Sequence, residues 1–229
     1  MNLCLQLLSS MATKDVLEAL CTQYEARSGQ PVLATSIGGV DAAKKVRAGE
    51  QTDVVVLAKN AIDLLISDGY LLPGCRVDLV KSGIAVAVKQ GKALPPLQTA
   101  QAVQDAVLAA KTVSYSTGPS GVYLEQLFTQ WGIFEQIKPR IVLAPAGVAV
   151  GSLVAKGEAD IGFQQYAELI NVKGITLVGA LPSDIQLITT FSAGILKTSS
   201  NQDQAKLLID FLSSNEATAT KEKSGMTNA

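Results

Sequence analysis

The run Asp53-Val54-Val55-Val56-Leu57 decides the fold class of this 229-residue chain. Four apolar residues in a row, three of them β-branched, are typical of a strand that is buried on both faces of a parallel sheet. The segment from Val40 to Ala48 before it and residues 60–67 after it read as helices. A buried strand between two helices indicates an α/β protein whose mostly parallel sheets are covered on both faces.

The same alternation continues in both directions along the chain. Upstream, an apolar run from Leu3 to Leu8 predicts a strand, and Val16, Leu17 and Leu20 have the spacing of a buried helix face. Further strands are expected at 32–34, 83–88, 112–115, 141–143, 161–163, 175–178 and 186–191, and helices at 99–110, 121–131, 148–156 and 202–213. The tail from Asn215 is polar, so we expect it to fray at its end.

Composition excludes several function classes. An apolar fraction of 48% excludes disorder, and a net charge of −1 with no basic run longer than Lys44-Lys45 argues against a nucleic-acid partner. Because the chain has no histidine, it has no Ser-His-Asp triad, Cys-His pair or histidine metal site. We therefore expect neither a metal nor a cofactor.

The cysteines and the apolar runs bear on compartment. The chain has three cysteines, Cys4, Cys21 and Cys75, which are widely spaced. An odd number at this spacing forms neither a metal motif nor a complete disulfide set. We therefore expect each cysteine to serve as a small buried hydrophobic residue, with its redox state undetermined. No apolar stretch reaches the roughly 18 residues of a membrane span. The start of the chain lacks the organisation of a signal peptide. The protein is therefore cytoplasmic if Met1 is the native start, or periplasmic if a signal peptide was removed.

Three polar loops lie between an expected strand and an expected helix: Ser9-Ser10-Met11-Ala12-Thr13, Ser36-Ile37-Gly38-Gly39 and the loop from Ser116 to Tyr123. Such helix starts suit anions, because free N–H groups point outward and the helix dipole adds partial positive charge. The same residue types also serve as ordinary caps and turns. Three such loops together favour a shared anion site.

Two further segments are candidates. One is the loop from Ala144 to Ala149, and the other contains the adjacent amides Gln164 and Gln165 after an expected strand. The glycines of these loops match neither the P-loop nor the dinucleotide fingerprint. Asp160 lies just before a strand, where turn hydrogen bonds are the expected role.

These segments together resemble the type 2 solute-binding proteins of ABC importers, in the branch of the molybdate-binding proteins. The resemblance covers essentially the whole chain, in order. It is carried by residues 7–17, by residues 46–55, by Gly118-Pro119-Ser120-Gly121-Val122-Tyr123, by Lys156-Gly157-Glu158-Ala159-Asp160-Ile161-Gly162 and by Val178-Gly179-Ala180-Leu181-Pro182.

The resemblance implies two α/β lobes, each a mostly parallel sheet flanked by helices, joined by two crossover strands that act as a hinge. Lobe I would comprise residues 1–79 and 186–229, and lobe II residues 80–185, with a ligand cleft between them. The expected ligand-binding residues are Ser9, Ser10, Met11, Ser36, Gly39, Ser116, Gly118, Ser120, Gly121, Tyr123, Val148, Gln164 and Gln165.

Two positions differ from the molybdate-binding pattern. Gly39 stands where those proteins present a serine, and Gln165 replaces the tyrosine that donates a hydroxyl. The loop from Ser116 and the two glutamines therefore favour a carboxylate or a phosphate-bearing metabolite. We expect a monomer that captures a small anion and delivers it to an ABC permease.

An enzyme remains an alternative, because the branch includes aconitate isomerase, which moves an allylic proton in a tricarboxylate. Such a reaction needs a positioned base and donors that stabilise the charged intermediate. The candidate bases are Lys14, Lys81, Tyr115, Tyr123 and Glu168. The four arginines fall on helix ends or in turns rather than in the loops of the site, which favours the binding protein.

Overall fold

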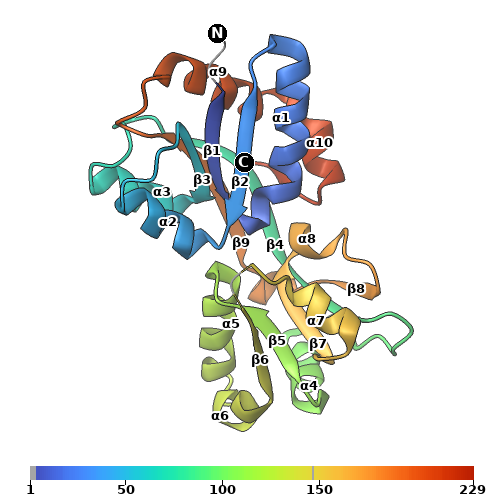
Figure 1. Cartoon of the computed structure of the whole chain (residues 1–229). Helices are drawn as coiled ribbons and strands as arrows, with labels where there is room; N and C mark the ends of the chain where they lie inside the picture. The colour runs from blue at the N-terminus through green and yellow to red at the C-terminus, as the bar shows by residue number, and fades with distance from the viewer. Residues whose placement is uncertain (1–3, 146) are drawn as a thin grey trace. The chain divides into compact units, whose positions relative to one another are not determined.

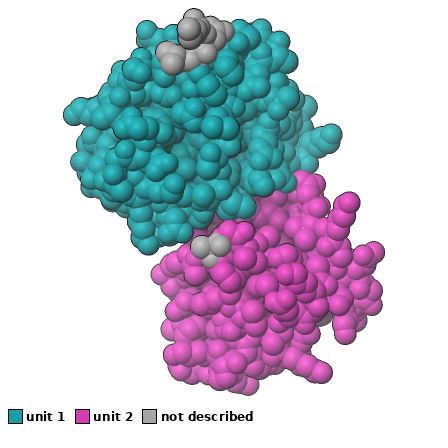
Figure 2. Space-filling view, in the orientation of Figure 1, with its two compact units in different colours: residues 1–81, 190–229 teal, residues 82–189 magenta. Residues whose placement is uncertain are grey.

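A computed structural model describes residues 4–145 and 147–229. The chain divides into two compact units (Figure 2): unit 1 consists of Met1–Lys81 and Thr190–Ala229, and unit 2 of Ser82–Thr189. Two strands, β4 (Val77–Lys89) and β9 (Ile188–Ile195), have residues in both units. Residue 3 of the expected strand 3–8 lies outside the described residues, as does residue 146 of the expected loop 144–149.

The sheet of unit 1 is parallel at its centre. Its further strands are β1 (Leu5–Ser10), β2 (Val32–Ile37), β3 (Val54–Ala58) and β10 (Thr227–Asn228). β1 lies between β2 and β3 and is parallel to both, while β9 pairs with β3 in the antiparallel sense. The carboxyl ends of β1, β2 and β3 therefore meet at one edge, which is where α/β sheets place ligands.

Helices cover both faces of this sheet (Figure 1). They are α1 (Lys14–Ser28), α2 (Gly39–Arg47), α3 (Lys59–Ser67), α9 (Gln202–Ser213) and α10 (Thr218–Lys223). Residues of α2 and α3, such as Ala42 and Ile62, pack on Leu8 and Val55. α1 contacts α9 and α10. The buried run that predicted the fold forms β3, as expected.

The sheet of unit 2 has β4 near one edge. Its other strands are β5 (Val113–Ser116), β6 (Ile141–Ala144), β7 (Ile161–Gln165) and β8 (Ile175–Ala180). β5 is parallel to both β6 and β7, whereas β4 is antiparallel to β7 and to β8. β5 and β7 thus end side by side.

The helices of unit 2 are α4 (Ala100–Ala109), α5 (Pro119–Gln130), α6 (Phe134–Ile137), α7 (Val150–Lys156) and α8 (Tyr166–Leu169). α4, α5 and α6 share a core with the sheet in which Phe128 stacks edge-on against Phe163. Leu169 of α8 packs against Ala85 and Ala87 of β4. Among the described residues no helix is long and apolar enough to cross a bilayer.

The C-terminal tail differs from expectation, because it is ordered. It forms α10 and then β10, which pairs with β4 at Val80 and Lys81. Lys221 is 1% exposed, and its amine donates to the Leu79 carbonyl and to Asn228 Oδ1, both at 3.0 Å. The prediction of a frayed end was wrong because one residue of this polar segment, Lys221, is buried and hydrogen-bonded.

Two smaller expectations also need correction. Of the cysteines, Cys21 is buried, whereas Cys75 is partly exposed and Cys4 is exposed, so burial does not describe all three. β4 begins six residues before the expected strand 83–88, since Asp78 and Lys81 interrupt the apolar pattern there.

Candidate functional site

In unit 1, two serines meet at the carboxyl edge of the sheet. Ser9 of β1 pairs in register with Ser36 of β2, and their hydroxyl oxygens lie 2.7 Å apart. Ser9 is fully buried, so its hydroxyl is held by protein rather than by water. The parallel register thus brings together two hydroxyls that are 27 residues apart in the sequence.

The next turn of chain completes this edge. Ser10 is buried, with its hydroxyl 3.3 Å from that of Thr13, and neither side chain caps a helix N–H. A Cβ atom built on Gly39 would lie 3.5 Å from the Ser10 Cβ, so α2 begins directly against the end of β1. Met11 opens the short 3-10 turn between Ser10 and α1. The structure therefore places the five expected residues of unit 1 along one edge.

A cation at this edge was missed by the sequence analysis. Lys59 follows β3 directly, and β3 lies beside β1, so Lys59 begins a helix at the same edge as the serines. Its amine lies 3.0 Å from Asp78 Oδ2, which balances its charge. Asp78 also accepts from Ser192 Oγ at 2.7 Å, and these partners hold its pKa below the ordinary value although burial acts to raise it. The signal that could have found Lys59 was its place immediately after a buried strand.

In unit 2, the loop after β5 is built around a close approach of backbones. A Cβ atom on Gly121 would lie 1.5 Å from the Ser116 carbonyl oxygen, so only glycine lets the first turn of α5 sit against the strand end. Pro119 begins the helix and Gly118 precedes it. Ser120, in the same turn, is 2% exposed.

The two adjacent glutamines at the end of β7 have different surroundings. Gln164 Oε1 accepts from the Val150 N–H at 2.9 Å, and its Nε2 donates to Glu168 Oε1 at 2.8 Å. Gln164 therefore connects the start of α7 to α8. Both polar atoms of its amide have protein partners.

Gln165 retains an atom without a partner. Its Nε2 donates to Thr189 Oγ1 at 2.9 Å, whereas its Oε1 is buried and has no hydrogen-bond partner among the described residues. Because a threonine hydroxyl both donates and accepts, turning the amide over would keep this bond and leave an N–H free instead. Gln165 thus keeps one buried amide atom without a hydrogen-bond partner among the described residues.

The remaining expected residues of unit 2 already have roles within the fold. The Tyr123 hydroxyl donates to the Ile185 carbonyl at 2.9 Å. The N–H of Val148 donates to the Pro145 carbonyl at 3.0 Å, although its side chain is exposed. Among the described residues, no hydrogen bond connects the Tyr123 hydroxyl or the Val148 N–H to the end of β7.

The five candidate bases differ in their surroundings. Burial raises the pKa of Tyr115 to about 12, so this phenol stays protonated at neutral pH. Lys14 lies 3.9 Å from Glu18 on the exposed side of α1. The main chain of Lys81 pairs with Thr227.

Glu168 stands out among them. Burial raises its pKa from 4.5 to about 7, while hydrogen bonds from the Gln164 amide and the Gln165 main chain act in the opposite direction. As the third residue of α8 it reaches back to the N–H of the capping residue, Gln165. Its carboxyl group therefore keeps its proton to a higher pH than an exposed glutamate does.

The other acidic candidates are structural. Asp160 Oδ2 accepts from the Lys111 N–H at 2.9 Å, in keeping with the turn role expected from the sequence. Asp53 accepts from the Gln6 N–H, the Ser199 hydroxyl and the Asn201 amide. Both carboxylates tie strand ends to neighbouring loops.

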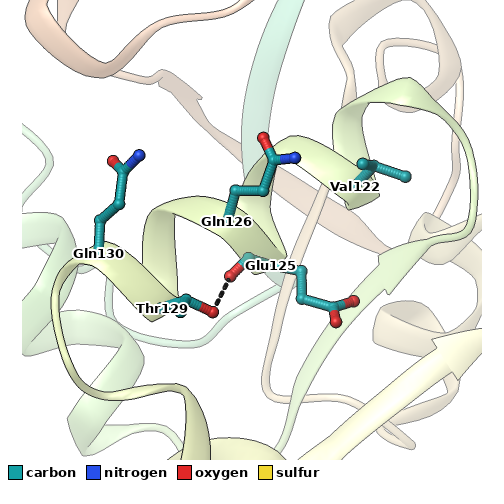
Figure 3. Close-up of a pocket in the computed structure, with 5 residues that line it drawn as sticks. All are labelled: Val122, Glu125, Gln126, Thr129 and Gln130. Atoms are coloured by element: carbon teal, nitrogen blue, oxygen red, sulfur yellow. Dashed lines mark hydrogen bonds between the residues drawn. The ribbon is translucent and has the colours of Figure 1, made fainter.

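A shallow open pocket on the outer side of α5 is distinct from these edges (Figure 3). It is lined by Val122, Glu125, Gln126, Thr129 and Gln130, and Thr129 Oγ1 donates to the Glu125 carbonyl at 2.7 Å. Its charged lining residue is acidic and all its residues come from a single helix. We therefore do not place an anion there.

With this geometry in place, comparison with known proteins identifies the family. The family model of the bacterial extracellular solute-binding proteins matches residues 5–227. The chain belongs to this family. A solved structure that resembles this chain over nearly its whole length has the expected α/β fold, which is thereby confirmed.

Three known proteins are similar to this chain over nearly its whole length. Aconitate isomerase of a Pseudomonas species is 33% identical over 97% of this chain and 87% of its own length. The periplasmic molybdate-binding protein of Azotobacter vinelandii has a TM-score of 0.82, with 22% identity over 98% of this chain and 99% of that one. PEB3 of Campylobacter jejuni, solved with bound L-phospholactate, has a TM-score of 0.75, with 16% identity over 98% of this chain and all of that one.

Proposed function

We propose that this protein captures a small anion, of the carboxylate or phosphate-bearing class, as the solute-binding component of an ABC importer. The observation that carries the proposal is the buried amide of Gln165, which ends a sheet strand with one polar atom unpartnered. Buried polar atoms are rarely left without a partner in proteins. A ligand that supplies this partner accounts for its presence.

Polar groups at other strand ends also support an anion. Ser116 ends β5, and Ser120 lies buried in the first turn of α5, where N–H groups are free of helical partners. In unit 1, Ser9, Ser10 and Ser36 present hydroxyls at the equivalent strand ends. Neutral donors suffice for an anion in a water-poor site, because low dielectric strengthens each hydrogen bond.

The ligand class follows from two positions, 39 and 165. Gly39 offers no hydroxyl beside Ser10, and Gln165 offers an amide, which can donate or accept as its orientation requires. An amide suits a ligand that bears both carboxylate oxygens and hydroxyl or protonated oxygens. This favours an organic anion over a bare metal oxyanion.

Delivery and location belong to the same proposal. An importer component works outside the cytoplasm, and the family description is consistent with that location. Its partner would be a membrane permease. We expect a monomer.

A second function, isomerisation of a tricarboxylate such as aconitate, is favoured by the 33% identity to aconitate isomerase. This reaction removes a proton from one carbon of an allylic unit and returns a proton to another, while the double bond shifts. Glu168, with its pKa near 7, is suited to exchange that proton. The other candidate bases from the sequence are Lys14, Lys81, Tyr115 and Tyr123.

A ligand screen separates the two functions. The purified protein is heated in the presence of molybdate, tungstate, sulfate, phosphate, phosphoglycerate, citrate, cis-aconitate or trans-aconitate, and the melting temperature is measured. The aconitates are also followed by proton NMR for interconversion. A bound ligand raises the melting temperature by mass action.

The outcomes are distinct. A rise with a carboxylate or phosphate compound, without turnover, supports the binding protein. Interconversion of the aconitates supports the enzyme. A rise with molybdate or tungstate alone would contradict the ligand class, and no rise with any anion would contradict the proposed function.

A further inference from the structure

Ser82, a residue of β4 in unit 2, has a buried hydroxyl without a partner. Among the described residues, three buried side-chain atoms lack a hydrogen-bond partner: the hydroxyl oxygens of Ser82 and Ser114 and Oε1 of Gln165. Ser82 is 3% exposed and Gln165 is 2% exposed. Because buried polar atoms in proteins nearly always have a partner, each of the three needs an explanation.

The register of β4 and β7 places Ser82 on the face of the sheet that carries the Gln165 side chain. Ile84 pairs directly with Gln165, and the side chains of directly paired residues lie on the same face. Ser82 precedes Ile84 by two residues in the same strand, so it shares that face. Ser82 is thus the diagonal neighbour of Gln165, at a spacing that a long side chain can bridge.

Contacts on the opposite face lead to the same placement. A Cβ atom on Gly83 would lie 3.1 Å from Ile188 Cδ1, so Gly83 and Ile188 face the same side. Ser82 is next to Gly83 in β4 and Thr189 is next to Ile188 in β9, so both turn to the other side. The Gln165 amide is on that side too, because its Nε2 lies 2.9 Å from Thr189 Oγ1.

The third unpartnered hydroxyl lies on the other face of the sheet. Ser114 of β5 pairs with Gly162 of β7, which is three residues before Gln165 and therefore faces the opposite side. A Cβ atom on Gly162 would lie 2.7 Å from Val150 Cγ1, so this face is covered by α7. Ser114 is separated from Gln165 by the sheet, which makes it a matched comparison for Ser82.

The first turn of α5 lies on the face of Gln165. Tyr115 pairs with Phe163, which is two residues before Gln165 in β7. A Cβ atom on Gly121 would lie 3.2 Å from Tyr115 Cδ2, so the start of this 12-residue helix packs on that side. The first N–H groups of a helix have no helical partner and carry partial positive charge, which suits an anion.

We propose that Ser82 is a ligand-binding residue, and that its hydroxyl and the Gln165 amide together bind one anionic oxygen group of the ligand, a carboxylate or a phosphate. The inference rests on the proposed function and deepens it. When the Thr189 hydroxyl donates to Gln165 Oε1, the Gln165 Nε2 is left as a free donor, and the Ser82 hydroxyl is a second donor. Two neutral donors match two oxygens of one carboxylate or phosphate.

Calorimetric titration tests the inference. The probes are citrate and trans-aconitate, which carry carboxylates, and phosphoglycerate, which also carries a phosphate. The variants are Ser82→Ala and Ser82→Cys, since a thiol replaces the hydroxyl with a weak donor. The matched control is Ser114→Ala, which removes the buried unpartnered hydroxyl of the other face. The melting temperature of each variant is also measured without an anion.

We expect the wild type to bind at least one probe. Ser82→Ala and Ser82→Cys should bind that probe about 10- to 100-fold more weakly, as for the loss of a hydrogen bond to a charged group, and Ser114→Ala should bind it as the wild type does. Without an anion, the melting temperature of Ser82→Ala should not fall, because its hydroxyl has no partner among the described residues to lose.

A double variant tests whether the two side chains bind the same group. Ser82→Ala combined with Gln165→Ala should lose less affinity than the product of the two single losses, because side chains that share one partner are not independent. A loss equal to that product would show that they bind separate groups, which contradicts the inference.

Other results would overturn the inference as well. Wild-type affinity in both Ser82 variants would show that Ser82 does not contact the ligand, and a lowered melting temperature with that same affinity would show that its hydroxyl serves stability alone. An equal loss in Ser114→Ala would show that the effect is not specific to this face. Failure of the wild type to bind any of the three probes would instead contradict the proposed ligand class, and the inference would fall with it.

Discussion

Neighbouring residues on a strand point to opposite faces, and in β7 this separates two roles. Gln165 has the free amide atom, so Gln165→Ala should lower the affinity for the captured anion. Gln164 bonds to Val150 and Glu168, so Gln164→Ala should lower the free energy of unfolding by about 1–3 kcal/mol. Urea denaturation and ligand titration of both variants measure the difference. If Gln164→Ala weakened binding more than Gln165→Ala, the register of the site would be off by one residue.

Glu168 also predicts how stability depends on pH. Its pKa is about 7 in the folded protein, raised from 4.5, so the folded state binds the proton more tightly. The resulting stability is complete below pH 4.5 and is lost as the pH rises through 7.

Glu168→Gln, which has no charge to bury, should therefore match the wild type at pH 4.5 and exceed it at pH 8 by up to about 3 kcal/mol. Thermal unfolding across this range provides the measurement. Equal differences at both pH values would mean that the carboxyl group titrates normally.

The position of the start of α5 depends on residue 121 being a glycine. Because a Cβ on Gly121 would lie 1.5 Å from the Ser116 carbonyl, Gly121→Ala must move the helix start away from β5. We expect a loss of stability of about 1–3 kcal/mol together with weaker anion binding, since Ser120 moves with the helix. Gly132→Ala, at the positive-φ turn after the same helix, is a control for backbone strain without such contact. Unchanged anion affinity in Gly121→Ala would remove the first turn of α5 from the site.

The longer elements could be predicted from the sequence because their apolar spacing is regular. The run at Val54 formed β3, and the stripe with Leu208 and Leu212 formed α9. α6 and α8 have four residues each, too few for a period to be recognised. α10 was missed since its buried residue is Lys221, which a polarity pattern assigns to the surface.

The candidate site was predictable only in part. Loops at the carboxyl ends of parallel strands could be recognised from the sequence alone, and they contain or adjoin the candidate residues Ser9, Ser36 and Gln165. Which amide atom of Gln165 is left free depends on Thr189, which is distant in sequence. The raised pKa of Glu168 depends on burial, which no local pattern shows.

At the scale of the whole molecule, the C-terminal tail stabilises the beginning of β4. Asn228 accepts from the Lys221 amine and donates to the Thr218 hydroxyl, so Asn228→Ala leaves a buried ammonium with a single carbonyl partner, that of Leu79. We expect a loss of about 1–3 kcal/mol in the free energy of unfolding. Thr227→Ala, an exposed neighbouring change, should have little effect in the same urea titration. Equal losses would indicate that backbone pairing, and not Lys221, holds the tail.

The pairing of β10 with β4 also constrains how this protein can be engineered. A tag or fluorescent protein inserted directly after β10 would lie next to a pair of hydrogen-bonded strands and to the segment through which β4 passes from one unit to the other. The exposed turn at 91–94 lies in unit 2 and far from the tail in sequence. Reporter groups belong in that turn, where they leave the C-terminal pairing intact.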